Sequence, residues 1–165
     1  MFYLDLFQAL EQHGVRYLLV GGLALNIHGV ERATMDVDLV VALDEKNLAA
    51  FLETAGVLGL TPVAPVPLAD FADEAKRRLW AEEKGMVAFA LRPRNPRAPT
   101  VDVLIQPTIE FEAAWQRRMA RDLGSLRVEV ASIDDLIVLK SGTGRMKDDA
   151  DVAALIRLKQ LREQR

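Results

Sequence analysis

The sequence predicts a single mixed α/β (α+β) domain: a mixed sheet flanked by helices, with a short helical C-terminal extension. Short apolar runs typical of buried strands alternate with helical stretches along the chain. The chain has 165 residues, 50% of them hydrophobic and 27% charged, which suits one compact core. It shows no internal repeat and no low-complexity segment. We assign residues 1–108 to the core and 109–165 to the extension, which we expect to pack on the core as one unit.

The expected elements follow from apolar periodicity and from residues that begin and end helices. In chain order they are helix 2–10, strand 16–20, helix 23–28, strand 36–43, helix 45–55, helix 70–84, strand 86–91, strand 100–105, helix 109–120, strand 126–130, helix 132–141 and helix 146–161. Gly14 ends the first helix, and the pair Gly21-Gly22 leads from the first strand into the second helix. Asp44 is placed to cap the third helix, and Gly56 to end it.

Proline and glycine punctuate the rest of the chain. Pro62, Pro65 and Pro67 mark a loop or a short edge strand. Residues 92–99 must form an exposed turn, because prolines at this density stop both helix and ladder. The strands on either side of that turn are therefore expected to form a hairpin. Ser132 opens a helix with a capping-box-like pattern, and two glycines separate that helix from the last one.

Composition excludes several kinds of site. The chain has no cysteine, which rules out disulfides, thiolate zinc sites and a cysteine nucleophile, and it has only two histidines. Its formal net charge of −3 argues against a strongly basic nucleic-acid binder. No apolar run reaches the roughly 18 residues of a membrane span, and the N-terminus lacks the basic start of a signal peptide. We therefore expect a cytoplasmic protein with no membrane segment, whose chemistry rests on carboxylates.

Two aspartates stand at the start of the second strand. Because strand side chains alternate between faces, Asp36 and Asp38 lie on one face, roughly 7 Å apart. The other Asp-x-Asp pair, Asp149 and Asp151, falls in a helix, where residues two apart diverge by about 200° and cannot chelate one ion. Asp36 and Asp38 are therefore the stronger metal-binding pair, although two solvated residues at a strand start explain the spacing as well.

A third carboxylate changes this balance. Asp102 lies inside the apolar run 101–105, where a charge needs a reason. If its strand neighbours that of Asp36, three carboxylates converge, and such close anions repel unless cations lie between them. All-oxygen ligation is typical of Mg²⁺ shared with substrate phosphates, and two such ions could clamp a phosphoryl or nucleotidyl transfer. Alternatively, Asp102 pairs with Arg92 or Arg32.

The glycine pair adds a second feature. Between a strand and a helix, Gly21-Gly22 lets backbone N–H groups approach a phosphate at the helix N-terminus. The pattern is not a P-loop, because G-x-x-x-x-G-K-[ST] is absent. A tight turn explains the two glycines without any ligand.

In their order along the chain, these features resemble the nucleotidyltransferase superfamily with the DNA polymerase β-like core. Within it, the sequence is most similar to the AbiEii-type proteins of type IV toxin–antitoxin systems and their short relatives. The resemblance covers residues 16–43 and 100–158 and is weak between them. The matching stretches are VGGLALNIH over 20–28, RxTxDxDL over 32–39 and SxxDLxxLK over 132–140. The resemblance implies a minimal nucleotidyltransferase fold.

The resemblance also implies the roles of the catalytic residues. Gly21 and Gly22 would lie against the triphosphate of an NTP substrate. Asp36, Asp38 and Asp102 would hold two Mg²⁺ ions. Asp102 would also help to deprotonate the acceptor hydroxyl, which then attacks the α-phosphate and expels pyrophosphate.

Four more residues would bind or neighbour the nucleotide. By resemblance, Lys140 would contact phosphates, Asp151 would lie near the same pocket, and Arg32 and Thr34 would be neighbours. Two of them also have explanations without a ligand. Lys140 near a helix C-terminus interacts favourably with the helix dipole, and Asp151 can pair with Lys147 at i, i+4.

The sequence departs from the family pattern in two ways. Many members have Gly-Ser where this chain has Gly21-Gly22, so Gly22 offers only its amide to a phosphate. The chain also lacks the large C-terminal lobe by which bigger members hold substrates. A partner or a homo-oligomer would then complete the acceptor site.

The expected function is Mg²⁺-dependent transfer of NMP from an NTP to a hydroxyl. The acceptor would belong to RNA, such as tRNA, or to a protein partner, in a toxin–antitoxin context with a cognate toxin or antitoxin. One alternative is a degenerate, non-enzymatic module that binds a nucleotide or a partner. The other is an antitoxin-type minimal enzyme that adenylylates a partner toxin.

Overall fold

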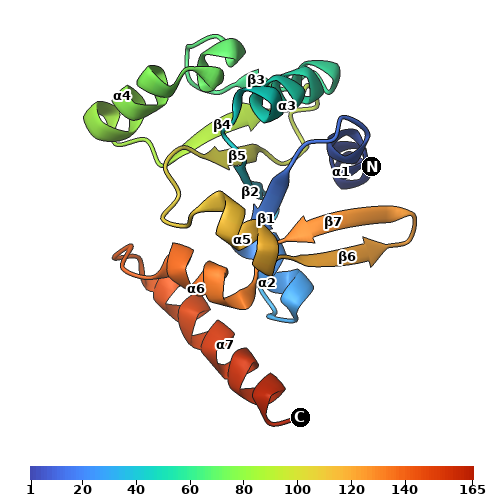
Figure 1. The fold of residues 1–165 in the computed structure, drawn as a ribbon, viewed down its shortest axis with the longest axis vertical. Helices are drawn as coiled ribbons and strands as arrows, with labels where there is room; N and C mark the ends of the chain where they lie inside the picture. The colour runs from blue at the N-terminus through green and yellow to red at the C-terminus, as the bar shows by residue number, and fades with distance from the viewer.

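The computed structural model describes residues 1–165 and contains one seven-stranded sheet of mixed direction, in the order β3-β4-β5-β2-β1-β7-β6 (Figure 1). The strands are β1 (Tyr17–Val20), β2 (Val37–Val41), β3 (Thr61–Pro62), β4 (Ala88–Arg92), β5 (Val101–Leu104), β6 (Met119–Leu123) and β7 (Leu126–Val130). The helices are α1 (Phe2–Gln12), α2 (Gly21–His28), α3 (Glu45–Val57), the 3-10 helix η1 (Leu68–Ala72), α4 (Glu74–Lys84), α5 (Phe111–Arg117), α6 (Ile133–Lys140) and α7 (Met146–Glu163). This architecture confirms the predicted mixed α/β (α+β) class.

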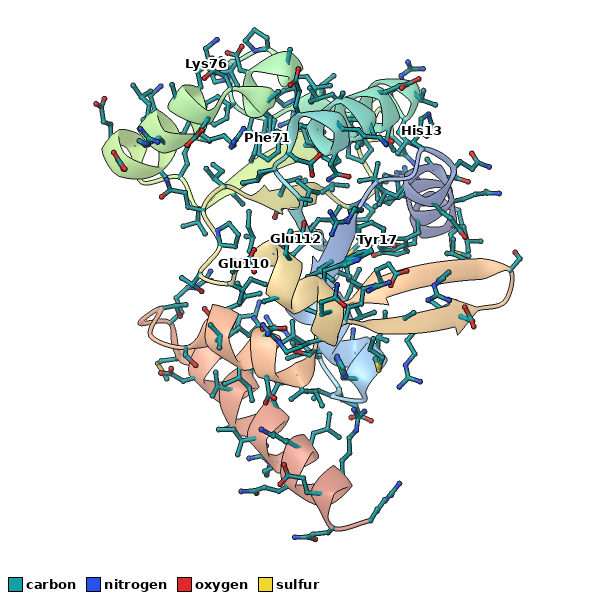
Figure 2. The ribbon with its side chains drawn as sticks, in the orientation of Figure 1. His13, Tyr17, Phe71, Lys76, Glu110 and Glu112 are labelled. Carbon is teal, nitrogen blue, oxygen red and sulfur yellow. The ribbon has the colours of Figure 1, made fainter.

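Aromatic side chains fill the core between one face of the sheet and the helices above it. Phe71 of η1 and Trp80 of α4 each stack on Phe89 of β4, with ring centroids 5.2 Å apart in both pairs. Phe7 of α1 packs on Tyr17 of β1, with ring centroids 5.9 Å apart. Phe71 and Tyr17 are labelled in Figure 2. Burial of each such ring contributes about 1.5–3 kcal/mol, so this layer fixes the sheet against α1, α3 and α4.

The remaining helices lie lower in the molecule. In Figure 1, α5 lies in front of β1, while α6 and α7 form a helical pair from which α7 runs to the C-terminus. Arg16 beside β1 pairs with Glu112 of α5 at 2.6 Å, and Glu110 caps the same helix (Figure 2). Ser132 Oγ accepts a hydrogen bond from Asp135 N at 3.1 Å, which confirms the predicted cap of α6. No helix is both long and apolar enough to cross a membrane.

Two more local predictions are confirmed. β4 and β5 pair antiparallel across the proline-rich turn 92–99, as expected for a hairpin. Asp44 caps α3 by accepting a hydrogen bond from Asn47 N at 2.9 Å. Both features depend on residues close in sequence, which explains why the sequence predicts them.

Three helix boundaries differ from prediction. Gly56 lies inside α3, and the chain turns instead at Gly59, where φ is +68°. The helix expected over 70–84 is divided, because Asp73 has an extended backbone and caps α4 as a new helix. The helix expected from residue 23 begins at Gly21, directly after β1.

One strand was missed. The helix expected over 109–120 ends early, because Arg118 is extended and β6 begins at the next residue. β6 pairs antiparallel with β7, and β7 pairs parallel with β1 through Val130 and Leu19. The C-terminal part of the chain thus adds two strands to the sheet, and the division of the chain at residue 108 stays a prediction.

A buried amide joins the two central strands at their far ends. Asn47 is buried, with only 5% of the residue exposed. Its Oδ1 accepts from Arg16 N at 2.7 Å, and its Nδ2 donates to Arg16 O at 3.0 Å and to Ala42 O at 2.8 Å. It therefore holds the start of β1 against the end of β2 and helps to fix their alignment.

Asn47→Ala is expected to lower the free energy of unfolding by about 3 kcal/mol, since three hydrogen bonds are lost and buried backbone groups remain unpaired. Urea denaturation measures the change. Lys46→Ala, at the exposed neighbouring position, serves as control and is expected to change stability by less than about 0.5 kcal/mol. Equal stability of the two variants would contradict this role of Asn47.

Candidate active site

The alignment of β2 brings two predicted acids together. β2 lies between antiparallel β1 and parallel β5, so Asp38 lies opposite Val20 on one side and Asp102 on the other. Paired residues on neighbouring strands point to the same face, and the Asp38 and Asp102 side chains therefore share one face of the sheet. Asp36 precedes β2, and its Oδ1 accepts a hydrogen bond from Thr100 N at 3.3 Å.

A cavity of about 350 Å³ collects most of the predicted site residues. Those that line it are Gly21, Gly22, Arg32, Thr34, Asp36, Asp38 and Lys140. Asp102 and Asp151 do not line it: Asp102 lies beside Asp38 in the sheet, and Asp151 pairs with the basic side chains of the cavity. The structure thus brings together residues from the first and last thirds of the chain.

The glycine pair makes room for two side chains of the site. Gly21 has a φ of +70°, and a Cβ there would overlap the carboxylate of Asp38. A Cβ on Gly22 would lie 2.7 Å from Thr34 Oγ1. Both glycines are therefore needed for close packing, and the first residues of α2 have no side-chain cap. The amides at the start of α2 are left available to a ligand.

Two aspartates of α7 hold the basic residues of the cavity. Oδ2 of Asp151 accepts a hydrogen bond from Arg32 Nη1 and lies 2.9 Å from Lys140 Nζ. Oδ1 of Asp148 lies 3.1 Å from the same Nζ. Asp151 thus pairs with Arg32 and Lys140. It does not pair with Lys147, the partner that the i, i+4 spacing in the helix allowed. All four paired side chains are at most 13% exposed, so each buried charge has a partner.

Several lining residues were not among the predicted site residues. They are Val20, Val87, Leu104, Leu136, Leu139, Thr143, Arg145, Lys147 and Asp148. The turn between α6 and α7 held one usable signal, because Thr143 stands between two glycines and is followed by a basic residue at the helix start. Val87 and Leu104 held none, since an apolar residue beside a strand is ordinary.

Burial and like charge shift the pKa values of the acids. The pKa of Asp38 is raised to about 6, first by burial and then by the charge of Asp102, against the opposing effect of Lys140. Burial also raises the pKa of Asp102, and the charge of Asp36 raises it further. Burial lowers the pKa of Lys140 despite its hydrogen bond to Asp148. The chain's own cations therefore leave the acids incompletely compensated.

The donor set fits a hard divalent cation. The acids offer only carboxylate oxygens, which Mg²⁺ prefers, and nearby cations compensate their charge only in part. Asp102 forms no ion pair with Arg92 or Arg32, the alternative that its sequence allowed. No three His, Asp or Glu side chains lie close enough to hold one ion together, and the Asp36 carboxylate turns to Thr100 N instead. The three-carboxylate metal site stays a prediction.

The family of the chain follows from its sequence profile. The profile described as "Nucleotidyltransferase of unknown function (DUF6036)" matches residues 4–162. The chain belongs to this nucleotidyltransferase family. No curated protein sequence matches it. The predicted enzyme class is thereby confirmed at the level of the family, whereas the similarity to AbiEii-type proteins stays a prediction.

Solved structures share the fold at low sequence identity. The lincosamide antibiotic adenylyltransferase LnuA, solved with lincomycin bound, has a TM-score of 0.59 and 13% identity over 95% of this chain and 94% of its own. An antigenic nucleotidyltransferase-like protein from Paracoccidioides brasiliensis has a TM-score of 0.58 and 19% identity, over 97% and 75%. ANT(2")-Ia in complex with adenylyl-2"-tobramycin has a TM-score of 0.54 and 12% identity, over 97% and 92%. The predicted nucleotidyltransferase fold is confirmed.

The contact between Gly21 and Asp38 predicts a specific loss of stability. Gly21→Ala is expected to cost about 1–2 kcal/mol for a side chain at positive φ and about 1–3 kcal/mol more for the overlap with Asp38. Gly124→Ala is the matched control, since Gly124 has a φ of +68° but no atom near its would-be Cβ. Gly124→Ala is expected to lose only the about 1–2 kcal/mol that a side chain at positive φ costs. Equal losses in urea denaturation would show that the close approach to Asp38 carries no cost.

The raised pKa of Asp38 predicts how stability depends on pH. The folded chain binds this proton more tightly than the unfolded chain, so the free energy of unfolding falls as pH rises from 3.8 to about 6. Asp38→Asn removes the ionisation. Relative to wild type, it should gain about 3 kcal/mol between about pH 4 and about pH 8, measured by urea denaturation with a chelator present. A difference that stays constant across this range would contradict the burial of the Asp38 charge.

Proposed function

We propose that this protein is a Mg²⁺-dependent nucleotidyltransferase that moves an NMP group from an NTP to a hydroxyl. The observation that carries the proposal is the pairing of Asp38 with Asp102 across β2 and β5, directly beside the glycine start of α2. Arg32 and Lys140 line the same cavity as Asp38 and supply positive charge opposite the acids. Membership in a nucleotidyltransferase family supports the reaction class.

The start of α2 is the proposed site for the triphosphate. Uncapped amides at a helix N-terminus, together with the helix dipole, attract phosphate oxygens. Gly21 and Gly22 have no side chain, which lets the Asp38 carboxylate and Thr34 pack directly beside this helix start. Arg32 and Lys140 add charge from the side, and the Thr34 hydroxyl lies against Gly22. We propose that these five residues bind the nucleotide.

Asp36, Asp38 and Asp102 would hold two Mg²⁺ ions, whose charge favours attack at the α-phosphate and departure of pyrophosphate. Asp102 would accept the proton of the acceptor hydroxyl, and its raised pKa would make its carboxylate a stronger base. The acceptor oxygen then bonds to the α-phosphorus as the bond to the pyrophosphate oxygen breaks. Gly21 serves this chemistry by leaving space for the Asp38 carboxylate.

For the acceptor, we propose a hydroxyl of RNA, such as tRNA, or of a protein partner in an AbiEii-like toxin–antitoxin system. Arg145 and Lys147 are exposed where they line the cavity, which suits an anionic acceptor. A small-molecule hydroxyl is the second candidate. Exposed Val87 and half-buried Leu104 give the cavity an apolar edge, and two structures with the same fold contain lincomycin and adenylyl-2"-tobramycin.

Substitution of the acids tests the proposal. With an α-labelled NTP, Mg²⁺ and pools of RNA, protein or small-molecule acceptors, Asp36→Ala and Asp38→Ala should each lower label transfer at least about 100-fold. Removal of Mg²⁺ with a chelator should have the same effect. Asp149→Ala, an exposed aspartate with no ion pair, is the control and should keep full activity. Equal labelling by wild type and Asp36→Ala across all pools would refute the proposal.

The alternative of a degenerate binding module is tested by calorimetry. Gly22 in place of a serine motivates it, since one hydroxyl that could contact phosphate is missing. Tight NTP binding that is independent of Mg²⁺, without label transfer to any acceptor, would favour the module. Binding that requires Mg²⁺ and is lost in Asp38→Ala supports the enzyme.

A further inference from the structure

We infer that Asp148 and Asp151 are positioning residues, which hold Lys140 and Arg32 in place for the phosphates and do not contact the nucleotide themselves. The inference rests on the proposed function, because it assigns the two cations to the triphosphate. It concerns the helix α7, which lies outside the sheet that carries the acids. It also changes the role of Asp151 from a nucleotide neighbour to a support of the residues that touch the nucleotide.

The two aspartates form one anionic surface on α7. They are three residues apart in a helix, so their side chains lie on the same face. Oδ2 of Asp151 accepts a hydrogen bond from Arg32 Nη1 and forms an ion pair with Lys140 Nζ. Oδ1 of Asp148 forms an ion pair with the same Lys140 nitrogen. The other oxygen of Asp148 accepts from Thr143 Oγ1 at 2.7 Å and from Arg145 Nε at 2.8 Å. One face of α7 thus holds cations from three separate segments.

Each buried cation keeps a donor that the aspartates do not use. Lys140 has three N–H groups, of which one donates to Asp148, and Asp151 forms an ion pair with the same nitrogen at 2.9 Å. Arg32 has five N–H donors, of which Asp151 engages one at Nη1, and its side chain lines the cavity. A phosphate oxygen in the cavity can accept from the guanidinium N–H groups that Asp151 leaves free. The aspartates therefore hold each cation from one side and leave further donors for a phosphate oxygen.

The aspartates themselves are poorly placed to touch the nucleotide. Their side chains are only 4% and 9% exposed, and their oxygens already accept from cations or pair with them. Asp148 lines the cavity, whereas Asp151 does not. A carboxylate facing a phosphate would also repel it. Their effect must pass through Arg32, which comes from the segment before β2, and Lys140, which ends α6. Without Asp151 these two like charges would repel each other and lose their common anchor.

Binding of Mg²⁺-tripolyphosphate, measured by calorimetry well below the melting temperature, tests the inference without requiring turnover. Asp151→Asn should weaken binding about tenfold, the scale of losses for outer-shell supports. Asp149→Asn removes the same charge from the same helix at an exposed position without an ion pair, and should leave affinity unchanged. If Asp151→Asn does not fold, Asp148→Asn is measured in the same way with the same expectation.

A double substitution shows whether the effect passes through a cation. In an Arg32→Gln background, Asp151→Asn should weaken binding clearly less than the tenfold expected in the wild-type background, because one of the two cations that Asp151 holds is already lost. In the transfer assay, Asp151→Asn should raise the KM for NTP about tenfold and change kcat less than about threefold. An undiminished loss in the Arg32→Gln background, or affinity equal to that of Asp149→Asn, would overturn the inference.

The two proposals fail separately. Tripolyphosphate binding that depends on Asp151 and Arg32, without NMP transfer to any acceptor, would overturn the proposed function and support the positioning role. Full transfer activity of wild type with Asp151→Asn indistinguishable from Asp149→Asn would overturn only the positioning role.

Discussion

The alignment of β2 between its two neighbours is the constraint on which the site depends. It places Asp38 beside Asp102 on one side and beside the end of β1, hence Gly21, on the other. Leu39, the next residue, points into the aromatic-lined core. A shift by one residue would exchange the two faces, burying Asp38 in that core and exposing Leu39. The core that holds β2 in register therefore also sets the position of the acids.

The acidic and the basic residues of the site are held by different parts of the fold. Asp38 and Asp102 stand on strands, where a rigid sheet keeps like charges close despite their repulsion. Arg32 and Lys140 line the same cavity as Asp38 and are already paired with Asp148 and Asp151 of α7. This arrangement leaves the acids in need of a cation and keeps the basic residues in fixed positions. It agrees with a substrate that arrives as a metal-bound polyphosphate, bringing positive charge to the strands and phosphate oxygens to the basic residues.

Much of the fold and the central site could be predicted because the signals are local. A cap such as Asp44 acts within three residues, and the acids are recognisable because they interrupt apolar strands. The failures have two causes. β6 was missed although Gly124-Ser125 forms the two-residue loop that joins it to β7, which is a local hairpin signal. Asp151 could be placed in a helix, but its partner Arg32 is 119 residues away, and only the packing of α7 on the site brings them together.

The same reasoning applies to the glycine pair. In the sequence, either a tight turn or a phosphate contact explains Gly21-Gly22. The spacing does not reveal that the absence of side chains on these glycines makes room for Asp38 and Thr34. That packing ties Gly22 to Thr34, so a larger residue at 22 would need a smaller one at 34. Thr34 thus occupies the space that a side chain at position 22 would need.

A crystal structure with Mg²⁺ and a non-hydrolysable NTP tests the account most directly. We expect metal density between Asp36, Asp38 and Asp102, and phosphates over the amides of Gly21 and Gly22. Arg32 and Lys140 should contact the phosphates while keeping their contacts to α7. A nucleotide bound elsewhere, or bound in this cavity without metal at the three aspartates, would contradict the central claim.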